Sequence, residues 1–167
     1  MAQISNLDKK YDPAIEPIRA LYDEYFGGGM NSIVFQEMRE TRGLAYSAWA
    51  SIMPPSYLKY PYVLRTQIAT QNDKMIDAVT TFNDIINNMP ESEAAFKLAK
   101  DGLTNRLRTE RIIKGDIIWS YINAQDLGQN VDPRIKLYND IQNMSLKDIV
   151  DFQKQWVKGR TYVLLKN

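Results

Sequence analysis

Two strand-like segments joined by a short proline-rich connection constrain the fold of this chain more than any other feature. Residues 44–53 are rich in aromatic and small side chains and end at Pro54-Pro55, which is typical of a strand. Residues 62–71 alternate between two faces, one of which carries Tyr62, Leu64, Thr66 and Ile68. The connection fits a hairpin, so we expect the two segments to pair antiparallel.

Before and after these two segments, apolar residues recur at helical spacing. Asp12-Pro13 is a typical helix start, Gly27–Gly29 stops that helix, and a second helix is expected from Asn31 or Ser32 to Gly43. Further helices are predicted over residues 73–89, after Pro90 and over residues 117–127. Two more are predicted, one from Asp132-Pro133 and one after the capping box Ser145–Asp148. Residues 161–165 are predicted to form a final buried strand.

The order of these elements predicts an α+β fold with an antiparallel sheet and helices packed on one face. With 167 residues the chain is long enough for one domain with a hydrophobic core. We expect a single domain over residues 13–167, preceded by a loose polar segment over residues 1–12. Neither a signal peptide nor a bilayer-spanning helix is expected from the apolar runs.

The chain has no histidine and no cysteine, and its net charge is +1. It therefore has no disulfide, no thiolate nucleophile and none of the usual ligands of zinc, and it lacks the commonest general base. The nearly neutral charge provides no electrostatic footprint for nucleic acid or an anionic membrane. We expect no nucleic-acid partner and no metal or cofactor in this chain.

The glycine triplet Gly27–Gly29 allows three interpretations. A phosphate cradle is disfavoured, because no Lys-Ser/Thr follows it and no strand precedes it. A tight turn between two helices is favoured, since glycine takes unusual backbone angles freely. The third interpretation is a close approach by the backbone of another chain or domain.

Arg39 and Tyr46 are the candidate binding residues. If the helix ends near Arg42 and Gly43 turns the chain into the strand, both side chains can point toward one groove. Arginine is a fork of donors for carboxylates or carbonyls, and a tyrosine hydroxyl can polarise a carbonyl oxygen. The simpler interpretation, an exposed arginine and a half-buried strand tyrosine, is favoured by spacing alone.

Other polar and aromatic residues have structural interpretations. The acids considered for a carboxylate site are more typical of solvated helix faces, and so are the basic residues of 97–111. The tryptophans are expected in the core. The acids are Glu37, Glu40, Asp116 and Asp126, and the tryptophans are Trp49, Trp119 and Trp156.

Residues 27–47, GGGMNSIVFQEMRETRGLAYS, resemble a run of the M16 metallopeptidases, the family of pitrilysin, insulinase and the processing peptidases. The family pattern is GGG-M-x-S-x-L-F-x-E-x-R-E-x-x-G-L-x-Y-S. From about Pro13 onward, the order and spacing of the predicted elements also resemble the family. The resemblance implies an M16 peptidase or LuxS-like metallohydrolase type of domain.

The resemblance also implies a division of labour. One M16 domain carries the inverted motif H-x-x-E-H and its zinc, and a facing domain without the motif supplies an arginine–tyrosine pair that holds the substrate peptide. On this pattern the pair is Arg39 and Tyr46, and this chain is the non-catalytic half of a zinc endopeptidase that degrades peptides or small unfolded proteins. It then holds no catalytic and no metal-binding residue and is inactive alone, with zinc in a companion domain on the same polypeptide or a partner subunit.

Three further expectations follow from the resemblance. Bacterial relatives favour a periplasmic or membrane-associated location. The family domain usually opens with a strand, which residues 1–12 do not clearly provide, so a missing strand would leave an unpaired sheet edge that invites a homodimer. The alternative function is a structural or scaffold subunit of the same fold with no proteolytic role; a free-standing ligand-binding module is less favoured, since it requires a closed pocket within one domain.

Overall fold

The computed structural model describes residues 1–111, 113–129, 132–160 and 163–165. Their elements follow the chain in this order: β1 (Ala2–Lys10), α1 (Glu16–Phe26), α2 (Ile33–Phe35), a π-helix (Gln36–Thr41), β2 (Ser47–Met53), β3 (Pro61–Ala69), α3 (Met75–Asn87), α4 (Glu93–Thr109), a 3-10 turn (Lys114–Asp116), α5 (Ile117–Asp126), α6 (Arg134–Gln142), α7 (Leu146–Trp156) and β4 (Val163–Leu165).

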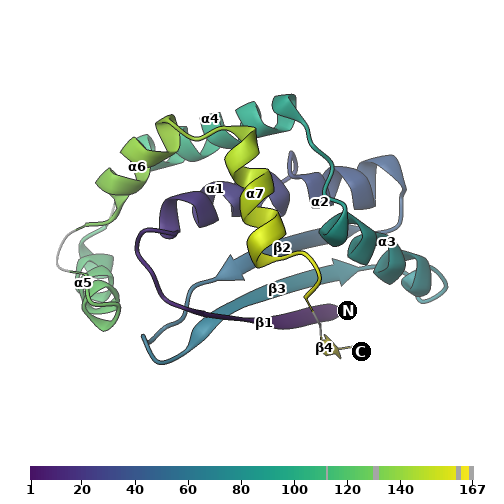
Figure 1. Cartoon of the computed structure of the whole chain (residues 1–167), viewed down its shortest axis with the longest axis horizontal. Helices are drawn as coiled ribbons and strands as arrows, with labels where there is room; N and C mark the ends of the chain where they lie inside the picture. The colour runs from purple at the N-terminus through teal and green to yellow at the C-terminus, as the bar shows by residue number, and fades with distance from the viewer. Residues whose placement is uncertain (112, 130–131, 161–162, 166–167) are drawn as a thin grey trace.

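The strands form one antiparallel sheet in the order β2-β3-β1-β4. The predicted hairpin is the β2–β3 pair, in which Ser47 lies opposite Ala69 and Ile52 opposite Leu64. Figure 1 shows α1, α4, α6 and α7 on one side of this sheet, with α1 and α7 crossing above it, while α5 lies beside one end of the strands. The predicted α+β fold class, with an antiparallel sheet and helices on one face, is therefore confirmed.

The N-terminal segment corrects an expectation, because residues 1–12 are not loose. Ala2–Lys10 form β1, which pairs with β3 on one side and β4 on the other. The buried positions of β1 include Gln3 and Ser5, so the apolar alternation that reveals most strands is missing. Gln3 is satisfied instead by a hydrogen bond from its side-chain amide to Asn83 Oδ1 at 3.1 Å. The sheet edge that motivated the homodimer is filled by this strand.

Aromatic side chains fill the space between the sheet and the helices. Tyr22 stacks on Phe26, and Phe152 stacks on Trp156, with ring centroids 5.2 and 5.1 Å apart. Trp156 is buried as expected, and the predicted face of β3 is buried as well. The capping box at Ser145 that starts α7 is present, with Ser145 and Asp148 bonded to each other's backbone.

The C-terminal half departs from the expected core in two places. Helix α5 forms as predicted, yet it has no buried residue, and Trp119 on it is 64% exposed. The helix lies away from the sheet (Figure 1), so its apolar side chains do not reach the core. Trp49, which was also expected in the core, is half-buried. The final strand is confirmed over Val163–Leu165, but Val163 is exposed rather than buried, and residues 161–162 lie outside the described residues.

Among the helices that the structure describes, none is long and apolar enough to cross a membrane.

Candidate functional site

The glycine triplet is the turn between α1 and α2, as its favoured interpretation predicts. Ser32 caps α2: its hydroxyl accepts from the Phe35 amide and donates to the Gly29 carbonyl at 2.6 Å. Gly27 allows a close backbone approach, but the partner is Ala50 of this chain's own β2. The triplet thereby sets the distance between α1 and the sheet.

A π-helix carries Arg39 to the surface. Met38 beside it is fully buried, and the Met38 carbonyl accepts hydrogen bonds from the amides of Leu44 and Ala45 at 2.9 and 3.2 Å. Gly43 has a φ of +58°, which reverses the chain after the helix. Single turns of π-helix occur frequently at functional sites. The buried methionine and this turn hold Arg39 and the approach to β2 in a fixed relation.

Arg39 and Tyr46 lie side by side at the start of β2. The Arg39 guanidinium carbon is 5.5 Å from the centre of the Tyr46 ring and 5.0 Å from the Phe35 ring, which are cation–π distances. Arg39 Nε is also 3.5 Å from a carboxylate oxygen of Glu40. Tyr46 is 81% exposed and lies just before the strand, so it is not the half-buried strand tyrosine of the simpler interpretation.

The two side chains line one groove of about 530 Å³. The Tyr46 amide donates to the Ala69 carbonyl at 2.8 Å, which joins the two walls. The groove is lined by Arg39, Gly43, Leu44, Ala45, Tyr46, Ala69, Thr70, Gln71 and Lys74. The expectation that Arg39 and Tyr46 share a groove therefore agrees with the geometry, while their binding role stays a prediction.

Sequence reasoning missed Thr70 and Lys74. Thr70 Oγ1 donates to the Leu44 carbonyl at 2.6 Å, and Lys74 Nζ donates to the Gly43 carbonyl at 3.2 Å. Thr70 could have been found from the hairpin, because the β2–β3 register that pairs Ser47 with Ala69 brings Thr70 next to Tyr46. No sequence signal indicated Lys74, which lies beyond the strand at the start of α3.

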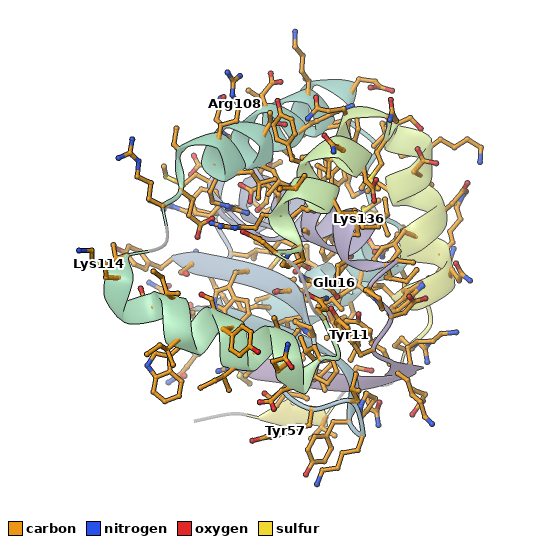
Figure 2. The ribbon with its side chains drawn as sticks, turned by 90° about the vertical axis from the view of Figure 1, so that its left-hand side faces the viewer. Tyr11, Glu16, Tyr57, Arg108, Lys114 and Lys136 are labelled. Atoms are coloured by element: carbon orange, nitrogen blue, oxygen red, sulfur yellow. The ribbon has the colours of Figure 1, made fainter. Side chains whose placement is uncertain are left out.

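Two other hollows lie on the side of the molecule that faces the viewer in Figure 2, where Tyr11, Glu16 and Lys136 are labelled. Their volumes are about 430 and 310 Å³, and α5, α6 and the segment before α1 contribute to their walls. The arginines here already have partners: Arg134 pairs with Asp132, and Arg19 with Glu16. The groove at Arg39 is the better candidate for a charged ligand, because its Lys74 bonds only to a backbone carbonyl and makes no ion pair among the described residues.

The residues present do not fit a zinc site. The whole sequence has no histidine and no cysteine, and within the described residues no three Asp or Glu side chains cluster where they could hold a metal ion. Two of the acids considered from the sequence have basic neighbours instead, since Glu37 lies 3.3 Å from Arg42 and Glu40 lies beside Arg39.

The fold defines an antiparallel α+β domain that carries an Arg–Tyr groove and, within its described residues, no cluster of acids that could hold a metal ion. The chain belongs to the family of peptidase M16 inactive domains, whose family model matches residues 17–103. The resemblance inferred from residues 27–47 is thereby confirmed. A search of the curated proteins finds no match for this chain.

Solved structures share the fold. The inactive peptidase domain of a proposed zinc protease from Bordetella parapertussis has a TM-score of 0.74 and 12% identity, over 97% of this chain and 88% of that one. The peptidase M16 inactive domain from Pseudomonas fluorescens has a TM-score of 0.67 and 16% identity, over 92% of this chain. A protease from Helicobacter pylori has a TM-score of 0.69 and 11% identity, over 93% of this chain. This chain spans only 37% of the length of each of the last two.

Proposed function

We propose that this chain is the non-catalytic half of a zinc-dependent M16 endopeptidase, in which it binds and orients the substrate peptide opposite a zinc-bearing domain. Membership of the inactive-domain family supports a catalytic M16 domain as its partner. The observation that carries the proposal is the exposed Arg39–Tyr46 pair on one groove. Zinc belongs to the companion domain, on the same polypeptide or on a partner subunit.

The two side chains supply complementary donors. Arg39 offers a planar fork of N–H groups that can hold a peptide carbonyl or carboxylate, and stacking on Phe35 and Tyr46 orients that fork. The Tyr46 hydroxyl can donate to a carbonyl oxygen and so orient the bond to be cleaved. Because backbone hydrogen bonds to Met38 and Ala69 hold both segments, little reorganisation accompanies binding.

Replacing Arg39 with alanine, or Tyr46 with phenylalanine, is expected to lower kcat/KM of the complete assembly about tenfold each. The magnitude corresponds to the loss of about one hydrogen bond of 1–2 kcal/mol to the substrate. The measurement is cleavage of a quenched fluorescent peptide. Arg42→Ala and Tyr57→Phe are matched controls, since both residues are exposed and lie outside the groove. Unchanged kcat/KM in both site variants would contradict the proposal.

The isolated chain is expected to be silent toward the same peptide and to support cleavage only with its zinc-bearing companion, where a chelator abolishes it. Cleavage by the chain alone would contradict the assignment, because its residues do not fit a zinc site. Silence in the mixture as well would favour a scaffold subunit of the same fold.

A further inference from the structure

The groove at Arg39 and Tyr46 is rich in hydrogen-bond donors and cations. Arg39 and Lys74 both line it, and none of its nine lining residues, all of which the structure describes, is acidic. The nearest acid in contact with either cation is Glu40, which lies 3.5 Å from Arg39 Nε only. The other guanidinium nitrogens of Arg39 make no ion pair that the described residues show.

Acceptors in the groove are largely taken by the protein itself. The Gly43 carbonyl accepts from Lys74 Nζ, the Leu44 carbonyl from Thr70 Oγ1, and the Ala69 carbonyl from the Tyr46 amide. The charged groups that a ligand meets in this groove, Arg39 and Lys74, are donors only. A group that only accepts hydrogen bonds and carries a negative charge suits this lining best.

Lys74 is held at the groove although its side chain is long and exposed. Its bond to the Gly43 carbonyl fixes the ammonium group beside the turn that follows Arg39, and two of its three N–H donors remain for a ligand. The two cations come from separate elements, the π-helix and the start of α3, and so approach the groove from different walls. A negatively charged group in the groove therefore faces cations from two walls.

We propose that the group anchored in this groove is a carboxylate of the substrate peptide, and that Lys74 is a specificity-determining residue that acts together with Arg39. This inference rests on the proposed function, since it names the chemistry of the peptide held at the same site. The carboxylate belongs either to the peptide's C-terminus or to an aspartate or glutamate side chain, which present the same charged acceptor.

The test is a titration of the uniformly ¹⁵N-labelled chain with three acetylated alanine-rich hexapeptides, followed by amide chemical shifts. One peptide ends in a free carboxylate, one in an amide, and one in an amide with a central aspartate. A stand-alone domain is a reasonable sample, because the Bordetella parapertussis relative is itself a chain of which this fold covers 88%. Weak binding is measurable in this way and needs no catalytic companion.

Shifts are expected around residues 43–46 and 69–74, with a carboxylate peptide binding about fivefold more tightly than the neutral one at low salt. Preference for the free C-terminus alone identifies the peptide end as the source, and preference for the aspartate peptide identifies a side chain. Lys74→Gln should reduce the preference to about twofold, and Lys74→Arg should retain it. The preference should also weaken as salt increases, which a purely structural role of Lys74 would not produce.

The control is Lys97→Gln, which removes the same charge from an exposed position of α4 away from the groove. Equal affinities for all three peptides, with shifts at the groove, would overturn the carboxylate preference and leave the peptide anchor standing. Absence of groove shifts with every peptide would overturn the inference. In that case, a tenfold loss of kcat/KM in assemblies that carry Arg39→Ala or Tyr46→Phe would still support the proposed function. Unchanged kcat/KM in both would contradict the proposed function as well.

Discussion

Replacing Gly27 with alanine is expected to lower the free energy of unfolding by about 3 kcal/mol, which is the upper end of what overpacking a well-packed interior usually costs. A Cβ at this position would lie 2.2 Å from the carbonyl oxygen and 2.5 Å from the amide nitrogen of Ala50. These are backbone atoms of β2, and they cannot move aside as the end of a flexible side chain would. The whole of α1 would have to shift away from the strand.

Gly29→Ala is the matched control for this prediction. It lies in the same triplet, but a Cβ there has open space, with nothing within 4 Å. Its free energy of unfolding is expected to stay within about 0.5 kcal/mol of the parent, because it neither clashes nor loses a contact. Urea denaturation of both variants measures the difference, and equal stabilities would show that α1 does not pack as closely on β2 as described.

The sequence predicted the helices, turns and strands that form the groove, but it did not predict all of the residues that line it. The glycine triplet, the cap at Ser32, the turn at Gly43 and the β2–β3 pair are all local patterns, and together they bring Arg39 to Tyr46. Lys74 could not be predicted, because its place beside Gly43 depends on how α3 leaves the sheet rather than on neighbouring residues.

Two misses have a common physical cause, which is that burial is decided by tertiary packing. β1 has the polar residues Gln3 and Ser5 at two buried positions, so no apolar alternation marks the strand. The Gln3 side chain donates to Asn83 of α3 and accepts from Thr66 of β3. Trp119 is a large apolar residue of the kind expected in a core, but α5 lies away from the sheet and leaves Trp119 exposed. A single sequence does not show where a helix lies relative to the core.

Charged groups of α1 cover the edge strand β2 at Ser51 and Ile52. Asp23 accepts hydrogen bonds from the Ile52 amide at 2.8 Å and from Ser51 Oγ at 2.9 Å, while Arg19 Nη1 donates to the Ile52 carbonyl at 3.0 Å and to Asp23 Oδ2 at 2.8 Å. The amide and carbonyl of Ile52, which this edge strand would otherwise offer to another chain, are thus occupied from within. This protection depends on a carboxylate whose side chain is only 16% exposed to water.

Burial raises the pKa of Asp23 from its usual 3.8 to about 6, although Arg19 and the hydrogen bonds from Ile52 and Ser51 oppose the rise. A raised pKa means that the folded state binds the proton more tightly than the unfolded state. The stability contributed by Asp23 is therefore fully present below about pH 4 and is lost as pH rises through about 6. The shift of about two pH units corresponds to about 3 kcal/mol.

We therefore expect the free energy of unfolding of the parent chain, relative to Asp23→Asn, to fall by about 3 kcal/mol between pH 4 and pH 8. Urea denaturation of both proteins at several pH values measures it, and subtracting the asparagine variant removes the contribution of other groups. Asp148→Asn provides a contrast, because hydrogen bonds from Ser145 lower the pKa of Asp148 and its contribution is instead lost as pH falls. If the free-energy difference between the parent and Asp23→Asn instead rises with pH, the pairing of Asp23 with Arg19 outweighs the cost of burial. The ion pair that covers Ile52 would then strengthen folding at neutral pH.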